Sequence, residues 1–207
     1  MERNMPAESG QRSGAEFMME IMQEMKRYAA FLRGVNISGK NRIRMPVLKA
    51  ELEQAGFWDV VTVGSSGNIV FSSGLSDLFS LRQKIETLIR EKFDLGIPVY
   101  VTEAQELCEV LAHAPGFWNS GDPAWYDNLI FILSDDSAQE IAALLGEPTA
   151  ELEKTEIYGP AIFWTFDRKR YQKCAWWKKT ADRGIGDKLT IRTANTMTKV
   201  CNICMHG

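Results

Sequence analysis

Residues that commonly build metal sites and disulfide frameworks are scarce in this sequence. Its 207 residues include two histidines and four cysteines: His113, His206, Cys108, Cys174, Cys201 and Cys204. A small secreted domain held together by disulfides contains a much larger share of cysteine. We therefore expect reduced thiols and no metal site.

The chain also lacks a long apolar run and an excess of positive charge. No segment approaches the roughly 20 apolar residues that cross a bilayer, and the N-terminus shows no apolar core followed by a small-residue cleavage site. The formal net charge is -3 and the pI is near 5.5, which disfavours a surface devoted to neutralising nucleic-acid phosphates. These absences predict a cytoplasmic protein without a membrane span.

Apolar residues make up 45% of the chain and recur with the periods of strands and helices. In the first half we predict strands at 28–33, 59–63, 68–73 and 97–101, and helices from Pro46 to Gly56 and from Asp77 to Phe93, the latter capped by Ser76. In the second half we predict strands at 128–134, 154–159, 161–166 and 188–192, and helices at 137–145, at 168–181 and from Ala194. The order β-α-β-β-α-β thus occurs twice.

This order predicts an α+β fold of two tandem ferredoxin-like (β-α-β-β-α-β) plaits with a C-terminal helix. The expected parts are a disordered N-terminal extension at 1–24, a first plait at 25–102, a connecting helix and loop at 103–125, and a second plait-like domain with the C-terminal helix at 126–207. A capping box of Thr102 and Gln105 is expected to begin the connecting helix.

The glycine-rich segment FLRGVNISGKNRIRM, at 31–45, collects four cationic side chains within twelve residues. The spacing from Gly34 to Lys40 is that of a nucleotide-binding P-loop, but Asn41 replaces the hydroxyl residue that binds magnesium. The next helix starts at Pro46, too late for its amides to cradle phosphates beside Lys40. The segment therefore predicts either a solvated, flexible loop or a site whose side chains bind a small anionic or phosphorylated ligand.

We expect the anion site to combine this loop, the hairpin turn that follows and the C-terminal segment. The candidate ligand-binding residues are Arg33, Gly34, Asn36, Gly39, Lys40, Asn41, Ser66, Asn68, Arg192 and Asn195. Arg192 joins the site if the C-terminal segment folds back onto the first half, and is structural if that segment stays on the second half. The function predicted first is binding of an anion through loop 33–44.

Two other classes of function stay open. Single-stranded nucleic acid could stack on an open sheet face through Tyr28, Phe31 and Phe71. An enzyme could assemble its site between the two plaits, although neither histidine has a visible catalytic partner. The carboxylates at 135–136 and 151–156 are interpreted as helix caps and solvated faces.

The C-terminal helix carries an apolar stripe. Met197, Val200, Cys201 and Cys204 fall at i, i+3, i+4 and i+7. Tetrahedral zinc needs more ligands than the Cys-x-x-Cys pair supplies. We therefore predict that the helix packs on the rest of the protein with both cysteines buried, reduced and unliganded.

Three ordered segments, RYAAFLRGVNISGKNRIRM, LEQAGFWDVVTVGSSGNIVFSS and TIRTANTMTKV, resemble the signature segments of the bacterial family called domain of unknown function (DUF) 1697. The resemblance extends over about residues 26–200. It implies tandem ferredoxin-like plaits and no established activity, substrate or cofactor. In the last segment Arg192 and Asn195 match the family pattern T-R-N-W-N-T-V, whereas Thr193 and Ala194 depart from it.

Overall fold

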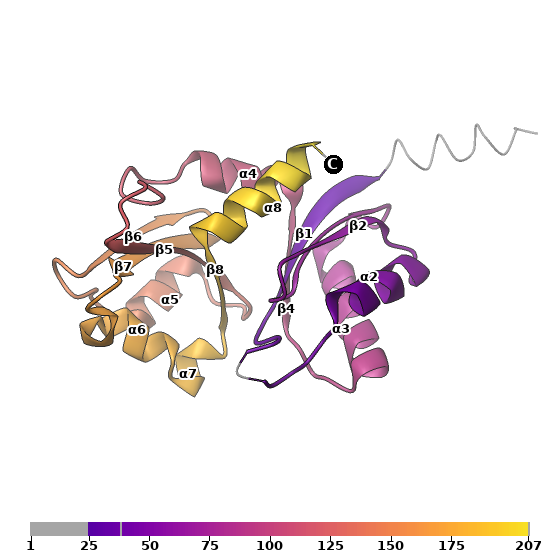
Figure 1. The fold of residues 1–207 in the computed structure, drawn as a ribbon, viewed down its shortest axis with the longest axis horizontal. Coiled ribbons are helices and arrows are strands. Elements are labelled where there is room, and N and C mark those ends of the chain that lie inside the picture. The colour runs from indigo at the N-terminus through magenta and orange to yellow at the C-terminus, as the bar shows by residue number, and fades with distance from the viewer. Residues whose placement is uncertain (1–24, 38, 207) are drawn as a thin grey trace, which may run out of the picture.

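The computed structural model describes residues 25–37 and 39–206 (Figure 1). The extension predicted at 1–24 lies outside these residues. The described chain forms two four-stranded antiparallel sheets and seven α-helices, which confirms the mixed α+β class. Across the described residues, every helix is too short or too polar to span a membrane.

The first sheet comes from residues 26–103. Its elements are β1 (Lys26–Leu32), α2 (Met45–Gln54), β2 (Trp58–Val63), β3 (Asn68–Ser73), α3 (Leu78–Phe93) and β4 (Val99–Glu103). The strands lie in the order β2-β3-β1-β4, and neighbouring strands are antiparallel. The last five residues of β1, YAAFL, are all buried, as expected for an apolar strand in the middle of a sheet.

The second sheet repeats this arrangement. Its elements are β5 (Trp125–Ile132), α5 (Ala138–Leu145), β6 (Glu153–Tyr158), β7 (Ala161–Asp167), a 3-10 turn (Tyr171–Lys173), α6 (Ala175–Thr180), α7 (Arg183–Gly186) and β8 (Leu189–Thr193). The strand order is β6-β7-β5-β8, again antiparallel throughout. Helix α4 (Ala104–Ala112) follows the first sheet, and α8 (Ala194–His206) follows the second.

Two helix starts differ from the predicted caps. The cap of α3 is Asp77 and not Ser76, because the Asp77 carboxylate accepts a hydrogen bond from the Ser80 amide at 2.9 Å. Helix α4 begins without a side-chain cap, since the Thr102 hydroxyl donates to Glu106 Oε2 at 2.8 Å. The capping box predicted at α4 is therefore wrong.

The helix predicted at 168–181 is broken by a buried carboxylate. Glu153 accepts hydrogen bonds at the start of α6 from the amides of Ala175 (2.8 Å) and Trp176 (3.1 Å), and from the indole of Trp164 (3.2 Å). An anion in this position satisfies amides that have no partner within the helix. Glu153 is thus a cap, as predicted, but it starts a new helix inside the segment expected to be continuous.

Replacing Glu153 with alanine is expected to lower the free energy of unfolding by about 2–3 kcal/mol. The change removes an acceptor from the amides of Thr149, Ala175 and Trp176 and from the Trp164 indole, at a position where Glu153 is 5% exposed. Urea denaturation measures the loss. Glu156→Ala, an exposed position on the same strand, serves as the control and should change stability by less than about 0.5 kcal/mol. Equal losses would contradict the capping role.

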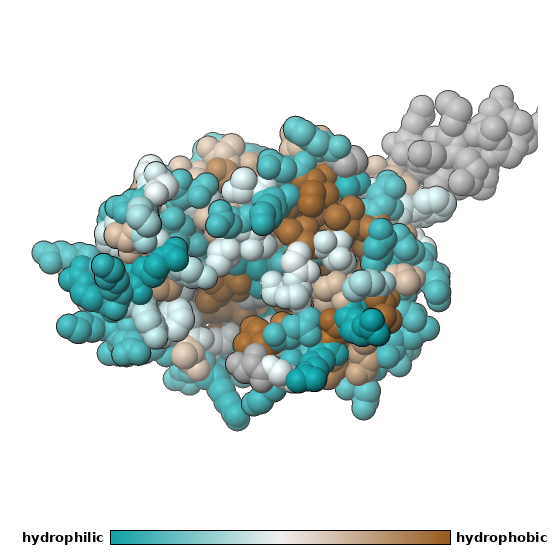
Figure 2. Space-filling model, in the orientation of Figure 1, coloured by the Kyte–Doolittle hydropathy of each residue, from teal (hydrophilic) through white to brown (hydrophobic). Residues whose placement is uncertain are grey.

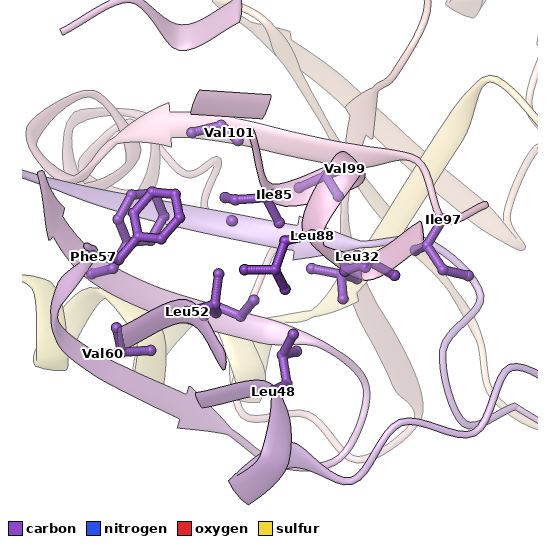
Figure 3. Packing of buried hydrophobic residues seen from close by; sticks show 14 of the residues in the cluster. Leu32, Leu48, Leu52, Phe57, Val60, Ile85, Leu88, Ile97, Val99 and Val101 are labelled. Atoms are coloured by element: carbon purple, nitrogen blue, oxygen red, sulfur yellow. The ribbon is translucent and has the colours of Figure 1, made fainter. Parts of the chain in front are cut away.

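The outer face of each sheet is covered by its own helices. On the first sheet, α2 and α3 bring their apolar side chains against the strands, and Figure 3 shows Leu48, Leu52, Ile85 and Val99 converging on one core. On the second sheet, α5 and α6 do the same, with Trp176 buried. The adjacent Trp177 is partly exposed.

The inner faces of the two sheets are turned toward each other, with α4 and α8 running across one side (Figure 1). Phe31 of β1 stacks on Phe131 of β5 with ring centroids 4.8 Å apart, and Tyr100 of β4 stacks on the same ring at 4.7 Å. Met197 and Val200 of α8 belong to this buried cluster. Packing of the C-terminal helix on the rest of the protein is thus confirmed.

The sheet surface predicted for base stacking is not open. Tyr28, Phe31 and Phe71 are all fully buried, Tyr28 and Phe71 beneath α2 and α3 and Phe31 between the sheets. Nucleic-acid stacking on these rings is therefore wrong, because both faces of the first sheet are used for packing. The face shown in Figure 2 is largely hydrophilic, with hydrophobic residues gathered beside α8 and in smaller areas lower on the same face.

A disulfide between Cys108 of α4 and Cys201 of α8 joins the two inner helices. The expectation of reduced thiols is therefore wrong for Cys108 and Cys201, because periodicity along one helix does not reveal a partner 93 residues away. Cys201 is also half-buried and not buried as predicted. Cys204 is free and buried as predicted. Burial raises the pKa of the Cys204 thiol to about 11.

Candidate functional site

Loop 33–44 connects β1 to α2 and is hydrogen-bonded to the turn between β2 and β3. The side-chain amide of Asn36 donates to the carbonyls of Ile43 at 2.9 Å and Ser65 at 2.7 Å. Its Oδ1 accepts from the Ile43 amide at 2.9 Å. The loop is therefore braced by a side chain that was predicted to bind the ligand, and the amide group of Asn36 is already used within the protein.

Four loop residues adopt the left-handed backbone conformation: Gly34 (φ 67°), Asn36 (φ 56°), Gly39 (φ 76°) and Asn41 (φ 47°). Glycine reaches this region without steric cost, and asparagine tolerates it because its short side chain hydrogen-bonds locally. Asn41 does so by donating to the Gly34 carbonyl at 3.0 Å. The glycines and asparagines thus set the shape of the loop.

Three cations of the loop extend into solvent. Lys40, Arg42 and Arg44 are exposed, and Arg42 Nε donates to the Gly39 carbonyl at 3.2 Å. Among the ion pairs of residues 25–37 and 39–206, none includes any of these three side chains. Their charges are therefore available to an anion in solution.

Arg33 points away from these cations and toward the second half of the chain. Its Nη2 lies 2.6 Å from Asp187 Oδ1, and its Nε donates to the Gly186 carbonyl at 3.2 Å. Both acceptors lie at the end of α7. Arg33 is thus a bridge between the two halves and not a free cation of the predicted site.

Arg192 is a second bridge, and it lies in the interior. Its Nε donates to Asn68 Oδ1, its Nη1 to Thr190 Oγ1 (2.9 Å) and the Ile191 carbonyl (2.8 Å), and its Nη2 to the carbonyls of Leu32 (2.5 Å) and Ser66 (3.3 Å). All five N–H groups of the guanidinium are therefore engaged. Arg192 is 8% exposed, and this burial lowers its pKa to about 10.

The hairpin turn supplies acceptors to Arg192. Asn68 is 1% exposed, and its side-chain amide donates to the Val63 carbonyl at 2.8 Å and to Ser66 Oγ at 3.2 Å. A Cβ added to Gly67 would lie 2.6 Å from Leu32 Cβ, so glycine lets the turn approach the end of β1. Within this turn the side chains of Ser65 and Ser66 are polar and exposed, whereas the side chain of Asn68 is buried and used within the protein.

Asn195 does not join the others. It is exposed and lines a separate pocket of about 220 Å³ with Asp127, Arg168 and Thr193. Arg192 contacts the first half of the chain, which was the condition given for its joining the anion site. Its N–H groups are nevertheless all hydrogen-bonded to protein acceptors, so its role is structural, as the other alternative stated. The structure therefore brings together nine predicted residues in and around the loop, and leaves Asn195 outside.

Sequence reasoning missed the partners that decide the roles of the two arginines. Asp187 and the Gly186 carbonyl hold Arg33, and Thr190 helps to hold Arg192. Thr190 lies two residues before Arg192 on β8, so both side chains are on one face of the strand. That spacing was a usable signal for Thr190, whereas backbone carbonyls leave no trace in a sequence.

The chemical groups around the loop are mainly cationic and amide side chains. Within the part of the chain that the structure describes, no three His, Cys, Asp or Glu side chains come together as a metal site. His113 stacks on Tyr158 with ring centroids 4.1 Å apart. What the loop offers is a braced backbone carrying three exposed cations.

A family model described as protein of unknown function (DUF1697) matches residues 25–163. Among solved structures, the chain is similar to a conserved bacterial protein from Streptococcus pneumoniae, with 25% identity, a TM-score of 0.75, and coverage of 87% of this chain and 99% of that one. An unknown protein from Galdieria sulphuraria matches with 12% identity and a TM-score of 0.25, covering 82% of this chain and 97% of that one. No curated protein matches the chain.

Proposed function

The chain belongs to the DUF1697 family of proteins of unknown function, and we propose that loop 33–44 binds a small anionic or phosphorylated ligand. The observation that carries the proposal is the exposure of Lys40, Arg42 and Arg44 on a loop whose backbone is held by Asn36 and Asn41. A braced loop loses little conformational entropy when a ligand binds, so more of the electrostatic attraction is retained as affinity.

The proposal assigns roles to the predicted residues other than Asn195, and it adds Arg42 and Arg44, two further cations of the loop. Lys40, Arg42 and Arg44 contact the anion, and the exposed Ser66 hydroxyl donates to it from the neighbouring hairpin. The remaining residues support the loop: Arg33, Gly34, Asn36, Gly39, Asn41, Asn68 and Arg192. Three cations in one loop suit a ligand with at least two negative charges, such as a phosphate monoester or a nucleotide.

Combined replacement of Lys40, Arg42 and Arg44 by alanine is expected to weaken phosphate-ester binding about tenfold. Each cation gives an exposed, salt-screened interaction of about 0.2–1 kcal/mol, and the 1.4 kcal/mol of a tenfold change lies near the middle of the range for three such interactions. Thermal shift with inorganic phosphate, pyrophosphate and nucleotides, followed by calorimetry at two salt concentrations, measures the effect.

The matched control replaces Lys178 of α6 and Lys199 of α8, both exposed and outside the loop. This variant should bind with unchanged affinity. A ligand that stabilises the triple variant as strongly as the original protein would remove the loop from the site. Absence of any shift with all of these anions would reject anion binding itself.

We also propose that each sheet with its helices is a ferredoxin-like plait, at 25–102 and 126–207, connected by 103–125. Three features support this: the order β-α-β-β-α-β, the strand orders β2-β3-β1-β4 and β6-β7-β5-β8, and the helices on the outer faces. A cytoplasmic location is proposed from the acidic composition and the small number of cysteines.

An enzyme site between the two sheets is not favoured. The space between the inner faces is filled by Phe31, Tyr100 and Phe131, and the guanidinium of Arg192 is already saturated by protein acceptors. Aromatic packing of this kind fills the space that a substrate would occupy.

A further inference from the structure

Three of the four cysteines lie together on the two inner helices. Cys108 of α4 is bonded to Cys201 of α8, and Cys204 follows Cys201 by about one helical turn. Cys108 and Cys201 are half-buried. A disulfide with partial access to solvent is chemically different from one sealed in a core, because a thiolate can reach it.

An open groove of about 810 Å³ leads to this cluster. Its lining includes Cys108 and Cys204, and it carries charges of both signs from Lys26, Arg27, Glu103 and Glu109. Cys201 does not line it, so Cys108 is the bonded cysteine that the groove presents. Attack from the groove therefore falls on the sulfur of Cys108.

We propose that the Cys108–Cys201 disulfide is a reversible redox bond, opened and re-formed by a small peptide thiol of the glutathione class that enters this groove. The proposal is independent of the anion site in loop 33–44. Glutathione carries two carboxylates and one ammonium group. Arg27 matches one of the carboxylates, and Glu109 matches the ammonium.

Arg27 is suited to this role because its hydrogen bonding is incomplete. Within the described residues its Nη1 has a long 3.4 Å contact to Ser72 Oγ, and its Nε is buried without an acceptor. Because Nε is shielded from solvent, an incoming carboxylate contacts the terminal nitrogens of the guanidinium, for which the long Nη1 contact is the hydrogen bond found among the described residues. Lys26, by contrast, is already paired with Glu103 at 2.8 Å on the exposed rim.

The exchange follows ordinary thiol–disulfide chemistry. The glutathione thiolate attacks the sulfur of Cys108, a new S–S bond forms, and the electron pair of the broken bond goes to the sulfur of Cys201, which takes up a proton. A second glutathione thiolate then attacks the glutathione sulfur of the mixed disulfide. This releases oxidised glutathione and leaves Cys108 and Cys201 as thiols, and oxidised glutathione drives the reverse steps.

Cys204 takes no part in the proposed exchange. Its burial keeps it protonated at neutral pH, and a thiol that stays protonated is a poor nucleophile. It therefore provides an internal control, since it lines the same groove without belonging to the bond.

The test equilibrates the full chain in buffers with graded ratios of reduced to oxidised glutathione, quenches with acid, alkylates free thiols and locates them by peptide mass spectrometry. Cys108 and Cys201 are expected to become free together with one midpoint, without added denaturant. Cys201→Ser should accumulate one glutathione, on Cys108. In Cys204→Ser, the glutathione ratio at the midpoint should stay within about twofold of that of the original protein. A twofold change is well below the tenfold change that corresponds to 1.4 kcal/mol.

Three results would overturn the proposal: a bond that opens only after urea is added, Cys108 and Cys201 both free in the most oxidising buffer, or glutathione attached to Cys204 instead of Cys108. If Cys201→Ser does not fold by circular dichroism, rapid acid quenching of the original protein decides the point. The transient mixed disulfide must then be found on Cys108.

Discussion

Replacing Arg192 with alanine is expected to lower the free energy of unfolding by about 3–5 kcal/mol. The substitution removes all five donors from a buried site and leaves Asn68 Oδ1 and the carbonyls of Leu32 and Ser66 without them. Each buried acceptor left unsatisfied costs about 1–3 kcal/mol. The guanidinium carbon also lies 5.5 Å from the centre of the Phe31 ring, so loss of this cation–π contact adds to the cost.

Urea denaturation measures this loss, with Arg42→Ala as the control for removing an exposed arginine. The control should change stability by less than about 0.5 kcal/mol. Arg192→Lys keeps a positive charge but has three donors on a single nitrogen, so it is expected to fall between the alanine variant and the original protein. A loss below about 1 kcal/mol for Arg192→Ala would show that water replaces the guanidinium, contrary to the structure.

Breaking the Cys108–Cys201 bond by Cys201→Ser is expected to cost about 2–4 kcal/mol. The bond joins residues 93 positions apart, and cross-linking distant residues removes many conformations from the unfolded chain. Because Cys201 is half-buried, the serine hydroxyl itself adds little to the cost.

The measurement compares urea midpoints with and without a reducing agent. Reductant should lower the midpoint of the original protein to that of Cys201→Ser and leave the variant unchanged. If reductant shifts both proteins equally, the effect does not come from this bond. If it shifts neither, the bond does not stabilise the fold.

The strands and most helices could be predicted because their signal is local. The strands predicted at 68–73 and 161–166, for example, correspond to β3 and β7 within one residue. The apolar residues of these strands and the regular apolar spacing of the helices are properties of each segment alone. Predictions failed where a distant partner decides the outcome. Glu153 starts α6 from a strand more than 20 residues earlier, and no property of segment 168–181 by itself indicates the break.

The candidate site shows the same division. The sequence correctly marked loop 33–44 as rich in cations and turn-forming residues, because those are properties of the residue types. It did not indicate that Arg33 and Arg192 are occupied by Asp187 and Asn68. The residue type does not show whether an arginine is hydrogen-bonded within the protein or exposed to a ligand. Only the positions of its acceptors in the folded structure distinguish the two cases.

The position of Arg192 near the end of the chain has a consequence for synthesis on the ribosome. The first sheet is complete once Glu103 has been made, yet its inner face and the Leu32 carbonyl receive their partners from residues made last. At 5–20 residues per second, roughly 5–20 s separate these events. During that interval the nascent chain exposes the inner face of the first sheet, which carries Phe31. Chaperones that bind apolar surfaces should therefore associate with ribosomes that have translated about half of the messenger RNA for this protein.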